Sequence, residues 1–229
     1  MGASALFPAV EPVPGTIERS LSKSGVRLVI GTDEVGRGCL AGPVVAAAVA
    51  LPVDLSIDGV NDSKKLSHRR RSSLVPTILE KATQTSVVEI SAHEIDEINI
   101  LQASLKAMRT AVLKVLSALS GDKSNAVVLV DGPHKLDDLP IQQSAVKQGD
   151  SVSMAIASAS IIAKVHRDRL MTDLARTHPG YGVEKNMDYG TAAHIFALNE
   201  LGVTVPPRRT IPPVRSRVPD IPGTSGIVS

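Results

Sequence analysis

The chain has 229 residues, and its 43% hydrophobic content is enough for one well-buried core with a small appendage. A formal net charge of +2 permits a nucleic-acid partner without requiring one, because dedicated nucleic-acid binders usually show a stronger basic bias. The single cysteine, Cys39, excludes a disulfide framework and a zinc knuckle, and no apolar run approaches the roughly 18 residues of a membrane span. We therefore expect a cytoplasmic protein with no membrane partner.

The N-terminal half predicts a loose lead-in, three strands and one helix. Residues 1–25 hold several prolines and little periodicity, so we expect them to be loose. The apolar runs 26–33 and 42–51 indicate two buried strands, which the short link between them makes antiparallel. Residues 85–91 predict a third strand, and Ser67 is placed to cap a helix that runs through 68–81.

The C-terminal half predicts two long helices around a short buried strand. Apolar residues at helical spacing predict an amphipathic helix over 99–119, and its position before the apolar run 126–130 favours a parallel crossover. A short edge strand is expected at 145–146, a second long helix at 151–177 and a last helix at 192–201. The folded part would then span 26–205, followed by a disordered tail over 206–229 that is rich in proline and arginine.

Acidic residues mark three of these expected elements. Asp33 and Glu34 end the first strand, Asp131 ends the fourth, and Asp150 precedes the second long helix. If strands one and four are neighbours, their acids meet at one edge of the sheet, within reach of the helix start. Carboxylates crowded together repel each other and require cations. Two Mg²⁺ or Mn²⁺ ions about 3.5–4 Å apart would suit in-line hydrolysis of a phosphodiester.

Each acid, taken alone, also has a structural alternative. Neighbouring strand residues point to opposite faces, so Asp33 and Glu34 can share one cluster only if the strand ends there. Asp131 before Gly-Pro is a common turn residue, and Asp150 is a plausible helix N-cap. Only the co-location of these acids in the fold separates the two interpretations.

Motifs that run in order from residue 28 to 202 together resemble those of type 2 ribonuclease H, the bacterial ribonuclease HII family. They are Asp33–Gly38 with Leu40–Val44, Asp62–Leu66, Asp131-Gly132, Ala157–Val165, His178–Gly182, Tyr189–Thr191 and His194. The resemblance implies an α/β ribonuclease H-like fold, with a five-stranded mixed sheet flanked by helices and a C-terminal helical extension. It also implies an endonuclease that cuts the RNA strand of RNA·DNA hybrids. Such an enzyme nicks duplex DNA 5′ of single embedded ribonucleotides, leaving a 3′-hydroxyl and a 5′-phosphate.

The same resemblance implies roles for individual residues. The acids that bind metal and carry catalysis would be Asp33, Glu34, Asp131 and Asp150. The residues that bind substrate would be Gly36, Arg37 and Gly38, whose backbone reads the ribose 2′-hydroxyl, Tyr189, which stacks on the next deoxyribose, and Lys64 and Lys164, which contact phosphates. Asp188 stands where the family usually has a glycine, and its charge is expected to alter substrate affinity or junction preference.

Three other functions are alternatives to this interpretation. Type 3 ribonuclease H acts on the same hybrids but typically carries an extra N-terminal domain, for which 25 loose residues are too few. A nucleotide-binding module is disfavoured because Gly36-x-Gly38 lacks the third glycine of the phosphate-binding motif. A non-catalytic nucleic-acid binder would tolerate loss of the acids, so mutation can distinguish it from an enzyme.

Other charged residues have ordinary structural interpretations. The arginines at 69–71 are expected on a solvated helix face, and Asp168 is expected to pair with Lys164 one turn before it. Cys39 is expected to be a small buried residue, and the arginines of the tail to be solvated. We see no apolar seam left for self-association and expect a monomer.

Overall fold

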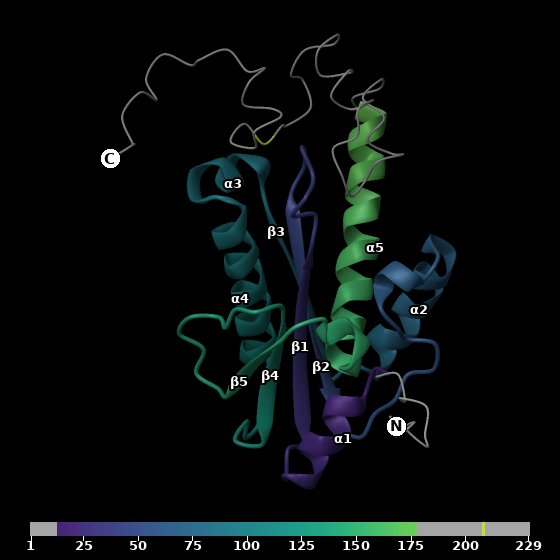
Figure 1. Ribbon diagram of the computed structural model, residues 1–229, viewed down its shortest axis with the longest axis vertical. Helices are drawn as coiled ribbons and strands as arrows, with labels where there is room; N and C mark the ends of the chain where they lie inside the picture. The colour runs from purple at the N-terminus through teal and green to yellow at the C-terminus, as the bar shows by residue number, and fades with distance from the viewer. Residues whose placement is uncertain (1–12, 178–207, 209–229) are drawn as a thin grey trace, which may run out of the picture.

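The computed structural model describes residues 13–177 and residue 208. A five-stranded sheet lies between two layers of helices (Figure 1). Its strands, in the spatial order β3-β2-β1-β4-β5, are β3 (Gln84–Ile90), β2 (Val44–Pro52), β1 (Leu28–Val35), β4 (Ala126–Asp131) and β5 (Gln143–Val146). β1 and β3 each pair antiparallel with β2, whereas β4 pairs parallel with both β1 and β5. The predicted mixed sheet is therefore confirmed.

The first strand extends further than the sequence indicated. β1 pairs with β2 as far as Val35 and Val45, so Asp33 and Glu34 lie inside the strand and not beyond its end. On its other side, the parallel pairing with β4 ends at Thr32 and Val130. Asp33 and Asp131 thus follow directly after the last paired residues of two neighbouring parallel strands.

The helices predicted from periodicity are present. They are α2 (His68–Lys81), α4 (Ile100–Ala118) and α5 (Met154–Thr177), and Ser67 caps α2 by accepting a hydrogen bond from the Arg70 amide. The sequence did not indicate α3 (Ala92–Ile98), which is only two turns long and is capped by Ser91. Two 3-10 turns, η1 (Ser63–Lys65) and η2 (Gly149–Ser151), lie near the sheet edge that carries the acids.

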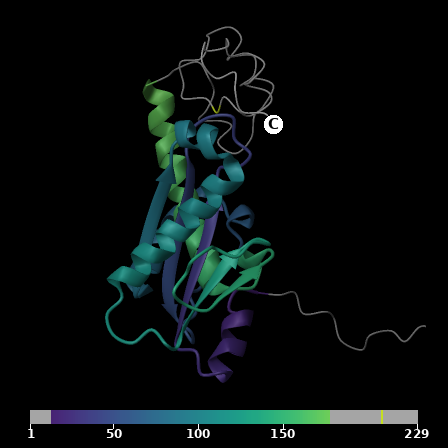
Figure 2. The same cartoon turned by 90° about the vertical axis from the view of Figure 1, so that its left-hand side faces the viewer.

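Alternation along the strands divides the core between the two helical layers. Ile30, Ala46 and Val128 pack with α4 on one face, whereas Val29 and Val127 pack with α5 and α2 on the other (Figures 1 and 2). Gly31 lets α5 come close, because a Cβ atom there would clash with the backbone of α5 at Ala155 and Ile156. The start of α5 is thereby fixed against the strand that carries Asp33.

Part of the expected N-terminal lead-in is folded, so the prediction that residues 1–25 are loose is wrong for α1 (Thr16–Lys23). Glu18 is 3% exposed and accepts hydrogen bonds from Ser153 Oγ at 2.6 Å and from the Ala155 amide at 3.1 Å. The amides of Gly15 and Ile17 donate to the Val152 carbonyl. These tertiary bonds hold α1 at the start of α5, which is why its own sequence gave so little signal.

The structure also describes one residue of the expected tail. Arg208 is fully buried, at 0% exposure, so the prediction of a solvated tail arginine is wrong at this position. The last predicted helix at 192–201, most of the C-terminal extension and the remaining tail residues lie outside the described residues. Among the helices that the structure describes, none is long and apolar enough to cross a membrane.

Candidate active site

Three elements bring the predicted acids together. Asp33 and Glu34 come from β1, Asp131 is the last residue of β4, and Asp150 lies in η2. Since Thr32 is paired with Val130, Asp33 and Asp131 extend side by side from parallel strands. Asp131 Oδ1 accepts a hydrogen bond from the Gly149 amide at 2.7 Å, which ties the end of β4 to the turn that holds Asp150. The convergence expected from the sheet order is confirmed.

The carboxyl groups are close enough to raise one another's pKa. Burial raises the pKa of Asp33 well above its usual value, and the charges of Asp131 and Glu34 raise it further, against a lowering hydrogen bond from Ser160. Burial likewise raises the pKa of Asp131, which the Gly149 amide partly offsets. Burial, followed by the charges of Asp62 and Asp131, raises the pKa of Asp150 to about 6.

Glu34 belongs to this cluster, although neighbouring residues of a strand such as Asp33 and Glu34 point to opposite faces. Burial raises its pKa, and the charge of Asp131 adds to that rise, whereas Arg37 lowers it. Arg37 Nη1 lies 3.2 Å from Glu34 Oε1, and the Glu34 side chain is 10% exposed. The Glu34 amide also donates to Asp33 Oδ1 at 2.7 Å. The two adjacent acids are therefore coupled through the backbone as well as through their charges.

The donor chemistry of this cluster suits hard divalent cations. Within residues 13–177 and 208, no three acid, imidazole or thiol side chains form a ready-made metal site. Mg²⁺, however, commonly binds through one or two carboxylates, several waters and substrate phosphate oxygens, so a closed protein cage is not required. Carboxylates whose pKa values are raised by burial, and further by the charges of their neighbours, would gain from such an ion. The acids present therefore fit the metal that the motif implies.

Lys64 lies beside the acids, and its contact with phosphate stays a prediction. It is exposed at η1, where its amide donates to Asp62 Oδ1 at 2.9 Å. Burial lowers the pKa of Lys64, but the charges of Asp150 and Asp33 outweigh that effect and raise it. Lys64 thus supplies positive charge at the open side of the cluster.

Lys164 lies in a different setting. Its Nζ is 2.9 Å from Asp168 Oδ1, which confirms the expected pair one turn apart, and its side chain is only 12% exposed. Arg71 Nη2 lies 3.6 Å from the other oxygen of Asp168. Arg71 also donates to the Ser63 and Leu66 carbonyls, so the expected solvated face holds for Arg69 and Arg70 but is wrong for Arg71. The contact of Lys164 with phosphate stays a prediction.

The sequence interpretation assigned no role to two hydroxyl groups that support Asp33. Ser160 hydrogen-bonds Asp33, and its Oγ lies 2.9 Å from Ser63 Oγ. Both serines are buried. The signal was available: a hydroxyl at 160 inside a small apolar helix needs a polar partner on the sheet it covers. Asp62, part of a motif but given no role by the sequence, also acts here, since its charge raises the pKa of Asp150 after the larger effect of burial.

The glycine-rich turn after β1 begins at a position that only glycine can occupy. Gly36 has a φ of 96°, and a Cβ there would clash with the Arg167 side chain. Arg37 and Gly38 are exposed, whereas Cys39 is buried, as predicted. Tyr189, with Asp188 before it, lies outside the described residues.

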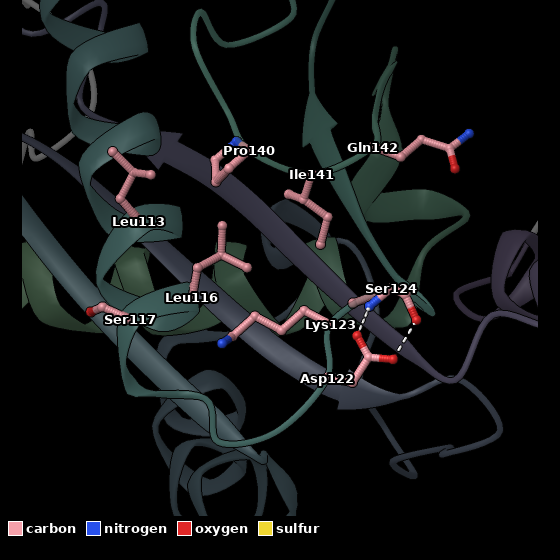
Figure 3. A pocket seen from close by; sticks show the side chains of 10 residues that line it. Leu113, Leu116, Ser117, Asp122, Lys123, Ser124, Pro140, Ile141 and Gln142 are labelled. Carbon is pink, nitrogen blue, oxygen red and sulfur yellow. Dashed lines mark hydrogen bonds between the residues drawn. The ribbon is translucent and has the colours of Figure 1, made fainter.

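A cavity of about 670 Å³ lies away from the acids. Leu113 and Leu116 of α4 face Pro140 and Ile141 across it, beside a turn closed by hydrogen bonds from Ser124 to Asp122 (Figure 3). It is also lined by Ala126, the first residue of β4, whereas Asp131 is the last, roughly 17 Å along the strand. This cavity is therefore separate from the candidate active site.

Comparison with known proteins agrees with the fold and the motifs. Residues 30–211 match the family model for ribonuclease HII. A ribonuclease HII from Shouchella clausii (strain KSM-K16) is 45% identical over 197 residues, which cover 86% of this chain and 73% of that protein. The crystal structure of ribonuclease H2 from Pyrococcus horikoshii OT3 is similar with a TM-score of 0.64 at 24% identity, covering 82% of this chain and 96% of that one.

A second solved structure, that of Bst-RNase HIII in complex with Mn²⁺, has a TM-score of 0.66 at 20% identity and covers 94% of this chain and 76% of that one. At these identities the two solved structures support the ribonuclease H-like fold alone. The family match and the sequence relative go further, since they span most of the chain. This chain belongs to the ribonuclease HII family of metal-dependent endoribonucleases.

Proposed function

We propose that the protein cuts the RNA strand of RNA·DNA hybrids and nicks duplex DNA 5′ of single embedded ribonucleotides, leaving a 3′-hydroxyl and a 5′-phosphate. One observation carries this proposal: four acids from β1, β4 and η2 crowd together, with their pKa values raised, beside an exposed lysine. Such crowding is unfavourable in a free protein and becomes favourable when cations and a phosphodiester are bound.

The residues that would hold two Mg²⁺ or Mn²⁺ ions are Asp33, Glu34, Asp131 and Asp150. When bound, these ions would activate a water molecule and neutralise charge on the departing 3′ oxygen. The protein orients the acids in advance, since Ser160 hydrogen-bonds Asp33 and the Gly149 amide fixes Asp131. Lys64, on the open side, would attract the substrate phosphate.

Selection of a ribonucleotide is assigned to the turn at Gly36–Gly38. This turn begins two residues after Glu34, so Gly36 lies roughly 7 Å further along the chain, within a nucleotide's length of the acids. Its exposed backbone at Gly38 can meet a ribose hydroxyl that a side chain would block. Tyr189 as the stacking residue and Lys164 as a second phosphate contact rest on the family resemblance alone. We further propose that the enzyme acts as a monomer in the cytoplasm.

The deciding experiment compares three duplexes of one sequence: all DNA, DNA with one ribonucleotide, and an RNA·DNA hybrid, each with Mg²⁺ or Mn²⁺. We expect cutting of the second and third only, with the nick mapped to the 5′ side of the ribonucleotide. Asp138→Asn, the same substitution at an aspartate outside the acid cluster, should leave this cutting pattern unchanged, because Asp138 is 89% exposed on the loop between β4 and β5. Equal cutting of the all-DNA duplex would rule out a reader of the 2′-hydroxyl.

A further inference from the structure

The turn between β1 and β2, residues 36–43, accepts hydrogen bonds from an arginine that is distant in sequence. Arg208 donates from Nε to the Gly42 carbonyl at 3.0 Å and from Nη1 to the Arg37 carbonyl at 3.1 Å. Its own amide donates to the Leu40 carbonyl at 2.9 Å. In both views the short yellow segment at residue 208 lies beside this turn (Figures 1 and 2). One side chain therefore links the two ends of the turn.

A second buried arginine contacts the same turn from α5. Arg167 is 0% exposed, and it donates from Nε to the Pro43 carbonyl at 3.2 Å and from Nη2 to the Ala41 carbonyl at 3.4 Å. Its guanidinium also occupies the space that a Cβ at Gly36 would take. Four of the eight carbonyl groups of the turn, those of Arg37, Ala41, Gly42 and Pro43, thus accept hydrogen bonds from the two guanidinium groups.

This arrangement is costly if its only role is to close the turn. Burial lowers the pKa of Arg208 to about 10, so the group stays protonated at neutral pH at the expense of its hydration, with Arg167 as a nearby like charge. Arg208 Nη2 is buried and finds no hydrogen-bond partner among residues 13–177. Antiparallel strands are routinely joined by turns that need no buried cation. The two arginines must therefore supply something other than chain reversal.

What they supply is the direction of the peptide groups. The described residues contain no cis peptide bond, and in a trans peptide the carbonyl of one residue points opposite to the amide of the next. Because the Arg37 carbonyl points to Arg208, the Gly38 amide points away from it. Gly38 is exposed, and the residue before it, Arg37, forms the ion pair with Glu34 of the acid cluster.

We propose that Arg208, supported by Arg167, is a positioning residue that sets the peptide orientation of the 36–43 turn and thereby the discrimination between ribose and deoxyribose. The proposal rests on the function proposed above for Gly36–Gly38. It extends the substrate-reading machinery to a residue beyond the acids, the glycine turn and the predicted tyrosine.

The test measures cleavage of the single-ribonucleotide duplex by Arg208→Gln and Arg208→Lys in the full-length protein. Loss of two hydrogen bonds from a charged donor should lower kcat/KM by about 10–100-fold for Arg208→Gln, and less for Arg208→Lys, which keeps one donor and the charge. Arg109→Gln is the matched control, since Arg109 also donates to a carbonyl, that of Asp137, but lies on α4. We expect it to stay within twofold of wild type.

Two further measurements distinguish a positioning role of Arg208 from a general loss of structure in its variants. The Mn²⁺ concentration for half-maximal rate should stay within twofold in the Arg208 variants, because the acids are untouched. Hydrogen exchange should quicken in residues 36–43 and stay unchanged in α4. If Arg208→Gln does not fold, Arg208→Lys decides the question by the same measurements.

Wild-type efficiency in both Arg208 variants would overturn the proposal. A loss of activity with a higher Mn²⁺ concentration for half-maximal rate and faster hydrogen exchange in α4 would also overturn it, since that pattern indicates a purely structural role. Failure of the proposed function has a different signature, because the wild-type protein itself would then cut the ribonucleotide and all-DNA duplexes alike.

Discussion

Replacing Asp150 by asparagine is expected to stabilise the metal-free protein while removing its activity. Asp150 has a pKa of about 6 in the fold, against 3.8 for a free aspartate. The fold therefore gains from a protonated Asp150 in full below about pH 4, and it loses that gain as the pH rises through about 6. At pH 7.5 the ionised carboxylate opposes folding, and the asparagine variant avoids this cost.

The magnitude follows from the shift. About two pKa units correspond to about 3 kcal/mol without screening. Asp150 is 7% exposed but lies beside the exposed Lys64 at an edge that solvent reaches, so we halve the figure to about 1–2 kcal/mol. For a chain of this size, that range corresponds to a rise in Tm of about 2–8 °C.

The assay is thermal unfolding in a chelator at pH 4 and pH 7.5, followed by a repeat with Mg²⁺. Asp150→Asn should unfold at the higher temperature at pH 7.5, and most of the difference should vanish at pH 4. Mg²⁺ should raise the Tm of the wild-type protein much more than that of the variant. Asp138→Asn should change Tm little, as an exposed substitution does. A lower Tm for Asp150→Asn at pH 7.5, or a gain of equal size at both pH values, would refute the reasoning.

Three other substitutions test how the site is built and supported. Gly31→Ala should lower the free energy of unfolding by more than about 3 kcal/mol or prevent folding, because the added Cβ would meet the α5 backbone. Gly121→Ala is the control and should lower it by only about 1 kcal/mol, because Gly121 has a positive φ but lies in open space. Chemical denaturation measures both values. Glu18→Ala should cost about 2 kcal/mol by leaving Ser153 and the start of α5 unpaired, and a Tm equal to wild type would contradict the role given to α1. Lys64→Gln should weaken duplex binding and reduce the slope of log K against log salt concentration by about 1. An unchanged slope would show that Lys64 does not contact a phosphate.

The sequence predicted the parts of the fold whose signal is local. The apolar runs that became β1, β2 and β4 and the periodic stretch of α4 are readable because burial on a sheet or helix face repeats every few residues. The gathering of Asp33 and Asp131 followed from the parallel crossover, which the helix between the strands required.

Features held by contacts between distant segments could not be predicted in this way. The helix α1 depends on Glu18, whose partners, Ser153 and Ala155, lie more than a hundred residues later around the start of α5. Arg208 carries no local pattern at all, because its partners are carbonyl groups of a turn near the other end of the chain. Glu34 was expected at the end of the strand, but pairing of Val35 with Val45 extends β1 beyond it.

The most direct test of the central claim is the single-turnover cleavage rate of Asp33→Asn on the duplex with one ribonucleotide, in saturating Mg²⁺. Burial raises the pKa of Asp33 and the charges of all three other acids raise it further, so its loss should remove cation binding without disturbing the 36–43 turn. We predict a fall in rate of at least about 100-fold, with duplex binding equal to or tighter than that of wild type. Undiminished cleavage by this variant would contradict the assignment of the acid cluster as the catalytic metal site.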